Sequence, residues 1–256
     1  MGVKELWTIL SPAKKEVSLD TLTGQTIAVD LSVWICENQG VKAVQGKVSK
    51  PHLRNLFFRI SNLIQLGITL VFVVDGDPPE LKWETISNRI NSRYKGRGRG
   101  STKDYKIGKP GRSHFKRQIK ECLELLDHLG VPYVQSKGEA EALCALLNQE
   151  GVVDGCITED GDAFLYGATT VYRNFNLAGK NPVIDCYKMA DIKRQLGLTR
   201  EALVALALLL GCDYVPRGVP GVGKVHALQL ISQFQGSNIL EQFKRWANDD
   251  VEFQRK

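Results

Sequence analysis

HLRNLFFRISNLIQLGITLVFVVD, at residues 52–75, combines the two hydrophobic patterns that decide the fold. Its first part, residues 52–67, places apolar side chains three and four apart, which predicts an amphipathic helix ending at Gly67. Its second part, residues 68–75, is a continuous apolar run that ends in Asp75, which is typical of a buried strand. A helix that leads directly into a buried strand is the repeating unit of a parallel α/β sheet.

The same alternation extends to both sides of this stretch. Strands are predicted at TIAVDLS (26–32), VPYVQ (131–135) and DGCIT (154–158), and helices at residues 113–130, opened by Ser113, and 138–151. TTVYRN (169–174) and VIDCYK (183–188) are expected to add a hairpin or edge strands. The main strand segments lack period-two alternation, which indicates that both faces of the sheet are covered. We therefore predict an α/β fold with a mostly parallel, twisted sheet between layers of helices.

After about residue 190 the pattern becomes helical. DIKRQLG, TREALVALALLLG and HALQLISQF show helical periodicity with short breaks between them. We expect a helical subdomain at residues 191–256, packed on an α/β domain at residues 1–190.

Acidic residues follow the predicted strands at points where their side chains can converge. Seven are candidates for one metal site: Asp30, Asp75, Glu139, Glu141, Asp160, Asp162 and Asp213. Asp30, Asp75 and Asp160 each end an apolar strand segment, and the carboxyl ends of parallel strands meet at one edge of the sheet. Crowded carboxylates repel one another unless cations neutralise them, and oxygen ligands favour Mg²⁺ or Mn²⁺ over zinc. The sequence therefore predicts metal-assisted hydrolysis of a polyanion.

These acids also have an ordinary structural interpretation. An Asp after a strand is often a helix cap or turn residue, and a Glu in a first helical turn is favoured by the helix dipole. Glu139 and Glu141 are two residues apart and do not share a helix face, so we expect one to bind metal directly and the other through water. Glu141 is the preferred direct ligand, and Glu159 is expected to lie outside the site.

A basic segment interrupts the α/β pattern. Residues 89–120 contain twelve lysines and arginines, among them Arg93, Arg97 and Arg99, and a single acid. Residues 95–112 are rich in glycine and almost without core-forming side chains, which predicts a flexible insert. A solvated linker is one interpretation. Contact with nucleic acid is favoured, because positive charge beside an acidic metal site suits a phosphate backbone.

GVPGVGK, at residues 218–224, matches the first part of a P-loop. Val225 follows where a P-loop requires Ser or Thr, and no apolar strand precedes the segment, so this interpretation is disfavoured. A glycine-rich turn between two helices is favoured instead. Its backbone N–H groups, with Gly221, Gly223 and Lys224, would hold one DNA phosphate, and an ordinary helix corner is the alternative.

Composition limits the class of protein. The formal net charge is +6 at pH 7, and the six cysteines form no C-x-x-C pair, which is typical of core residues in a reducing compartment. The sequence has neither a signal-peptide pattern nor an apolar run long enough for a membrane span, so a membrane association or a secreted location is not expected.

Taken together, these segments resemble the flap endonuclease/XPG family of structure-specific nucleases. The resemblance runs in order along nearly the whole chain, through MGVKELW, TIAVDLS, VFVVDGDPPELK, GEAEALCALLN, ITEDGDAFLYG and GCDYVPRGVPGVGK. Within that family the chain is most similar to GEN-type Holliday-junction resolvases, as indicated by VWICE (33–37), KPHLRNLFFRIS (50–61) and GRSHFK (111–116).

The resemblance implies roles for particular residues. It implies that the seven acids bind two Mg²⁺, with Mn²⁺ able to substitute, and that residues 1–190 form a nuclease domain. Lys82 and Arg89, on the helix after Asp75, would reach toward the scissile phosphate, and Gly2 would lie near the active site. Residues 211–233 would form a helix–two-turn–helix element that binds a monovalent cation such as K⁺ through backbone carbonyls.

The function that the resemblance implies is Mg²⁺-dependent, structure-selective cleavage of Holliday junctions, which are four-way DNA junctions, and of 5′ flaps. Such a chain would be a monomer when free and a dimer on junction DNA, in the nucleus or in a cytoplasm with access to chromosomal DNA. The alternatives are a 5′-flap endonuclease or 5′ exonuclease without junction activity, and a non-catalytic module that binds branched DNA.

The chain differs from the family that it resembles in two respects. Residues 95–112 do not resemble the helical arch of flap endonucleases, which argues against threading of a free 5′ end through a closed arch. GEN-type proteins are also expected to continue past residue 256 with a chromodomain, so we expect this chain to be a nuclease core fragment.

Overall fold

The structure, a computed structural model, describes residues 2–38, 48–82, 85–86, 110–176, 182–234 and 239–245. Within these ranges the strands form one sheet in the order β1-β7-β6-β5-β2-β3-β4. Their bounds are β1 (Lys15–Ser18), β2 (Thr26–Asp30), β3 (Thr69–Val74), β4 (Tyr133–Gln135), β5 (Gly155–Ile157), β6 (Thr170–Asn176) and β7 (Val183–Lys188).

Most of the sheet is parallel, as predicted. β2 pairs in parallel with β3 on one side and with β5 on the other, and β4 and β6 extend the parallel set in the two directions. β7 pairs antiparallel with β6, and β1 pairs antiparallel with β7. The expected hairpin of β6 and β7 is thus confirmed, whereas β1 was not predicted.

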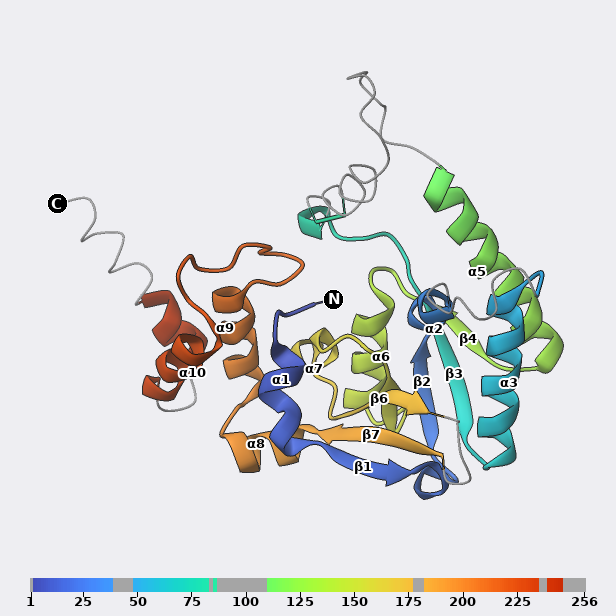
Figure 1. Cartoon of the computed structure of the whole chain (residues 1–256), viewed down its shortest axis with the longest axis horizontal. Coiled ribbons are helices and arrows are strands. Elements are labelled where there is room, and N and C mark those ends of the chain that lie inside the picture. The colour runs from blue at the N-terminus through green and yellow to red at the C-terminus, as the bar shows by residue number, and fades with distance from the viewer. Residues whose placement is uncertain are drawn as a thin grey trace, which may run out of the picture.

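Helices cover both faces of the sheet (Figure 1). Their bounds are α1 (Leu6–Leu10), α2 (Leu31–Asn38), α3 (Pro51–Gln65), α5 (Pro110–Leu129), α6 (Ala140–Gln149), α7 (Asp162–Tyr166), α8 (Met189–Leu196), α9 (Arg200–Leu210) and α10 (Lys224–Gln233), with 3-10 turns η1 (Ser11–Ala13), η2 (Leu19–Leu22) and η4 (Glu80–Lys82). Residues 239–245 are also helical. None of the helices described here is both long and apolar enough to cross a membrane.

Each central strand contributes to two apolar cores. Val29 of β2 belongs to the core formed with α2, α3 and α5, whereas its neighbour Ala28 belongs to the core formed with α1, α6, α7 and α9. Phe72 and Val73 of β3 divide in the same way. Successive side chains of a strand point to opposite faces, so a strand that is apolar at every position needs cover on both sides.

The C-terminal helices pack on the α/β layers. Leu206 of α9 and Ile231 of α10 lie in the same apolar cluster as Cys144 of α6 and Phe164 of α7. This cluster fixes α9 and α10 against the sheet, in the arrangement that the sequence predicts. The division of the chain near residue 190 remains a prediction.

Several predicted boundaries differ from those of the structure. The strand expected at residues 26–32 ends at Asp30, and α2 begins at the next residue. The helix expected to open at Ser113 begins at Pro110, because proline fits the first helical position, where its missing N–H has no intrahelical partner to lose. The end of the insert predicted at 95–112 is therefore helical, and residues 95–109 lie outside the described residues.

Candidate active site

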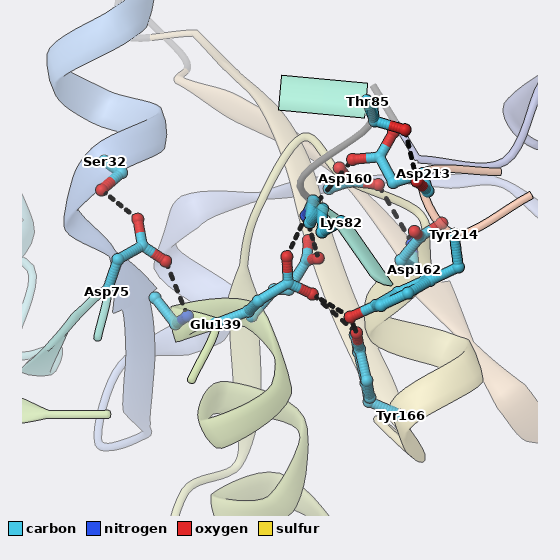
Figure 2. A network of polar contacts seen from close by, with 12 residues as sticks. Ser32, Asp75, Lys82, Thr85, Glu139, Asp160, Asp162, Tyr166, Asp213 and Tyr214 are labelled. Atoms are coloured by element: carbon cyan, nitrogen blue, oxygen red, sulfur yellow. Dashed lines mark hydrogen bonds and ion pairs between the residues drawn. The ribbon is translucent and has the colours of Figure 1, made fainter. Parts of the chain in front are cut away.

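The carboxyl ends of the parallel strands bring the predicted acids to one edge of the sheet. Asp30 is the last residue of β2, Asp75 directly follows β3, and Asp160 follows β5 after a short loop. Because β2 is hydrogen-bonded to both β3 and β5, these acids enter from adjacent strands. Figure 2 shows Asp75, Asp160 and Asp162 in the polar network at this edge.

Asp30 and Asp75 also cap helices. Asp30 Oδ1 accepts hydrogen bonds from the backbone N–H groups of Ser32, at 2.8 Å, and Val33, at 3.3 Å, in the first turn of α2. Asp75 Oδ1 accepts from the Ala140 N–H at 2.8 Å, at the start of α6, and its Oδ2 accepts from Ser32 Oγ at 2.5 Å. The capping interpretation and the convergence at the sheet edge are therefore both correct, and the caps fix where the carboxylates point.

Three other acids form the tightest group of possible ligands. Each of Glu141, Asp160 and Asp162 offers an oxygen within 4.8 Å of the oxygens of the other two. Glu141 is in the first turn of α6 and Asp162 begins α7. Asp162 Oδ1 accepts from the Val3 N–H at 2.9 Å, and Asp160 Oδ1 accepts from the Asp162 N–H at 3.2 Å. Three carboxylates at this spacing match the oxygen ligands preferred by Mg²⁺.

Burial and mutual repulsion make it unfavourable to ionise several acids at this edge. Burial, with repulsion from Asp75, raises the pKa of Asp30 to about 7. Burial, with repulsion from Asp160, raises the pKa of Asp162 to about 7. Burial, with the charges of Asp160 and Asp162, also raises the pKa of Glu141. A bound cation would remove this penalty, because it stabilises the ionised forms.

Lys82 lies among the remaining acids. Its Nζ donates a hydrogen bond to Glu139 Oε1, and it lies 3.2 Å from Asp213 Oδ2 and 4.0 Å from Glu141 Oε1. Burial opposes ionisation of Glu139, but the hydrogen bond from Lys82 and two from tyrosines outweigh it and hold the pKa of Glu139 below its ordinary value. Lys82 and Arg89 were expected on one helix after Asp75, but Lys82 ends the 3-10 turn η4.

Two tyrosines complete this part of the site and were not predicted. The phenol oxygens of Tyr166 and Tyr214 each lie 2.7 Å from Glu139 Oε2, and 2.7 Å from each other (Figure 2). Burial raises the pKa of Tyr214 to about 12 and raises that of Tyr166 further, so both phenols stay protonated and can donate. Tyr166 could have been predicted from the sequence, because it is four residues after Asp162 and residues at that spacing share a helix face.

Glu159 lies outside the acid group, as expected. It accepts hydrogen bonds from the Arg173 side chain, at 3.1 and 2.9 Å, and from the Asn174 N–H at 2.6 Å. The ion pair with Arg173 uses Oε2, and the hydrogen bond from Asn174 uses Oε1, so both carboxylate oxygens are occupied. Glu159 therefore binds residues of β6 and is not among the candidate metal ligands.

Gly2 lies directly against two of the acids. Its φ of +54° favours glycine, and a Cβ at this position would collide with the carboxylates of Asp160 and Asp162. The next residue, Val3, donates its N–H to Asp162. The implied position of Gly2 near the acid site is confirmed, and the N-terminal segment forms part of the wall of that site.

The sequence matches two family models. The XPG N-terminal domain matches residues 1–96, and the XPG I-region matches residues 130–213. All seven acids lie within these two regions.

The chain belongs to the XPG family.

Relatives within the XPG family agree with this assignment. The human flap endonuclease GEN homolog 1 is 58% identical over 246 residues, which cover 96% of this chain and 26% of the relative. This chain thus spans about a quarter of the length of that relative. The structure of human GEN1 in complex with Holliday junction DNA matches with 54% identity and a TM-score of 0.79, over 98% of this chain and 60% of that chain. The catalytic core of Rad2 in complex with a DNA substrate matches with 35% identity and a TM-score of 0.76, over 97% and 73% of the two chains.

The glycine-rich turn also lies where the XPG resemblance places it. It joins α9 to α10, with Gly221 at a φ of +80° and Gly223 as the N-cap of α10. Lys224 is the first residue of α10, and its Nζ lies 3.7 Å from Glu5 Oε2. The predicted turn between two helices is confirmed, and its contact with a DNA phosphate remains a prediction. Arg89, Arg93, Arg97 and Arg99 lie outside the described residues.

Proposed function

We propose that this chain is the catalytic core of a Mg²⁺-dependent, structure-selective DNA endonuclease that cuts four-way junctions and 5′ flaps. The observation that carries the proposal is the group of acids at the carboxyl edge of a parallel sheet, with Glu141, Asp160 and Asp162 within 4.8 Å of one another. The similar chains of human GEN1 and Rad2 were solved with junction and substrate DNA, which supports DNA as the polyanion.

The donor chemistry fits magnesium. Glu141, Asp160 and Asp162 would hold one ion, and Asp30 and Asp75 lie at the adjacent strand ends. Bound ions would supply an activated water and stabilise the oxygens at phosphorus. Mn²⁺ should substitute for Mg²⁺, because both prefer oxygen ligands.

The chain itself supplies positive charge for the substrate. Lys82 contacts Glu139 and Asp213 and lies 4.0 Å from Glu141, and we assign it the stabilisation of negative charge that develops on the scissile phosphate. Arg89 has the same proposed role. Further contacts to DNA are assigned to the basic residues Arg93, Arg97 and Arg99 and to the turn at Gly221, Gly223 and Lys224.

The same proposal includes a site for a monovalent cation and the pairing of two copies of the chain on DNA. Gly211 and Gly218, in the turn that follows α9, both have a positive φ, and on the family resemblance we assign a K⁺ site to this helix–two-turn–helix element. The chain would be a monomer when free and pair with a second copy on a four-way junction. A location with access to chromosomal DNA, in the nucleus or cytoplasm, would be required.

Substitution of Asp30 by Asn tests the metal-dependent reaction. Asn keeps the size of the side chain and an oxygen that can accept from Ser32 and Val33, but it removes the negative charge. We expect Asp30→Asn to bind a labelled four-way junction with the wild-type Kd and to lose cleavage by at least about a thousandfold. Nicking of the junction by this variant at saturating Mg²⁺ would contradict the assignment.

Parallel assays of junctions and 5′ flaps distinguish the substrates. Junctions whose arms have no free 5′ end, and 5′ flaps, are incubated with the wild-type chain in Mg²⁺ and in Ca²⁺. Cleavage of both substrates in Mg²⁺, and binding without cleavage in Ca²⁺, is the expected result. Cleavage of flaps alone would support a flap endonuclease without junction activity. A non-catalytic binding module is disfavoured, because a cluster of carboxylates without metal would repel DNA.

A further inference from the structure

The ammonium group of Lys82 lies between carboxylates that a metal site would use. It donates to Glu139 Oε1 and lies 3.2 Å from Asp213 Oδ2, with its side chain only 13% exposed. The family resemblance gives Lys82 a contact with DNA, but in this DNA-free chain it neutralises two of the seven acids instead. Among the described residues, Lys82 is thus a cation that this part of the site already contains.

The hydrogen bonds to Glu139 leave little room for a second cation. Its Oε2 accepts from Tyr166 and Tyr214, both at 2.7 Å, and its Oε1 accepts from Lys82. These donors leave one acceptor position free, on Oε1, so a divalent ion that bound Glu139 would share this oxygen with the Lys82 ammonium. An ammonium and a divalent ion that share one carboxylate oxygen also repel each other strongly in a partly buried site.

Lys82 is the donor that can move. Tyr166 is held on α7, and Tyr214 follows Asp213, whose backbone carbonyl accepts from Thr85 Oγ1 at 2.5 Å. Lys82 ends a short turn in a segment that is neither α-helix nor strand from residue 75 to residue 82, and its neighbour Leu81 is 75% exposed. A lysine side chain has a flexible four-carbon stem, and a phosphate oxygen is as good an acceptor for its ammonium as a carboxylate oxygen.

We propose that Lys82 is an internal counter-ion that occupies the second cation position of the acid site until a DNA phosphate draws it away. The DNA-free chain then binds one divalent ion at Glu141, Asp160 and Asp162. A second ion reaches Glu139 and Asp213 only after Lys82 leaves them. This inference rests on the proposed function, and it adds an order of binding in which substrate DNA completes the metal site.

The test measures metal binding without DNA and without turnover. Mn²⁺ is titrated into the 256-residue chain, and bound ions are counted by equilibrium dialysis and by electron paramagnetic resonance. We expect the wild-type chain to bind one Mn²⁺ tightly. We expect Lys82→Met to bind a second Mn²⁺ at least tenfold more tightly than the wild-type chain does, with a spin-coupled signal from neighbouring ions.

A matched control removes a lysine from another buried carboxylate. Lys15 Nζ lies 2.7 Å from Asp191 Oδ2, away from the acid site, so Lys15→Met should bind Mn²⁺ as the wild-type chain does. Lys82→Gln is tested in parallel, because its neutral amide can still donate to Glu139 and so preserves the fold if Lys82→Met does not. Circular dichroism of each variant confirms that it is folded.

The outcomes separate the inference from the proposed function. Identical Mn²⁺ isotherms for the wild-type chain and both Lys82 variants would overturn the inference, even if the wild-type chain cuts junctions. A second, tighter ion in Lys15→Met as well would also overturn it, since the effect would then follow from net charge alone. Absence of Mn²⁺ binding in every variant would overturn the inference and the proposed function together.

Discussion

Asp162 is buried at the start of α7 beside the carboxylate of Asp160, and burial together with this repulsion raises its pKa from 3.8 to about 7. Without a cation, a carboxylate in this position is destabilising when it is ionised. The hydrogen bond from the Val3 N–H offsets only part of the cost. A buried acid that opposes folding is retained in a metal site because the folded chain binds a cation there that the unfolded chain cannot bind.

The pH dependence of stability follows from the sign of this shift. Below pH 3.8 Asp162 is protonated in both states. Between 3.8 and about 7 the unfolded chain releases the proton and the folded chain keeps it, so the contribution of Asp162 to stability falls as pH rises through this window. In a chelator, Asp162→Asn should match the wild-type free energy of unfolding near pH 4 and exceed it at pH 8 by up to about 4 kcal/mol.

Thermal unfolding at the two pH values measures this difference. Mg²⁺ provides the control, since at pH 8 it should raise the Tm of the wild-type chain and have much less effect on Asp162→Asn. A variant that is less stable than the wild-type chain at pH 8 in chelator would show that repulsion among the acids does not dominate the site.

The acids were predictable and their partners were not. Asp30, Asp75 and Asp160 stand at the ends of apolar runs, and parallel strands bring such positions to one edge whatever the intervening sequence. Lys82 meets Glu139 across 57 residues, and Tyr214 meets it across 75. No periodicity links residues so far apart, because their contact depends on how a loop and a helix end pack in three dimensions.

The turn between α9 and α10 depends more on Gly218 than on Gly221. Gly218 has a φ of +59°, and a Cβ there would lie 2.5 Å from the Leu209 carbonyl oxygen and 2.6 Å from the Gly211 nitrogen. Gly221 has a φ of +80°, but a Cβ there would have no atom within 4 Å. Both positions need a left-handed backbone, but only Gly218 also needs the space.

Alanine substitutions separate these two requirements. Gly221→Ala should lower the free energy of unfolding by about 1 kcal/mol, the cost of a left-handed alanine. Gly218→Ala should lower it by at least about 3 kcal/mol, because backbone atoms of α9 must also move. Denaturant unfolding of the two variants measures the difference, and equal losses would mean that the turn adapts to a Cβ at residue 218.

The long elements were predictable from pattern, and two of the short ones, β1 and α7, were not. α3 has many apolar residues at a helical period and β3 is a continuous apolar run, so tertiary contacts only confirm what the two patterns favour. β1 has four residues with no buried position, and α7 has five, so neither is long enough to show a period. β1 forms because β7 offers an edge to pair with, which local sequence does not reveal.

The molecule as a whole joins the acid site to the glycine-rich turn through the N-terminal segment. Val3 donates to Asp162, the Lys4 N–H donates to the Gly211 carbonyl at 3.1 Å, and Lys4 Nζ donates to the Pro216 carbonyl at 2.8 Å. The candidate metal ligands and the proposed DNA-binding turn are thus held at a fixed separation. A duplex bound at the turn would be presented to the acids in one register.

Lys224 provides the test of this arrangement, because it begins α10 and its ammonium lies at the N-terminal end of that helix beside Glu5. If it holds one DNA phosphate, Lys224→Ala should weaken binding of any branched DNA by about fivefold at 0.1 M salt, whatever the base sequence. The slope of log Kd against log salt concentration should also fall by about 0.9, the value for one released counter-ion. Lys193→Ala, which removes an exposed lysine from α8, is the matched control and should leave both quantities unchanged.

Filter binding or fluorescence anisotropy across a salt series, in Ca²⁺ so that no cleavage occurs, measures the Kd and the salt slope of each variant. A slope that is the same for Lys224→Ala and the wild-type chain would mean that the positive end of α10 faces solvent in the complex, and that the backbone of the turn alone positions the DNA.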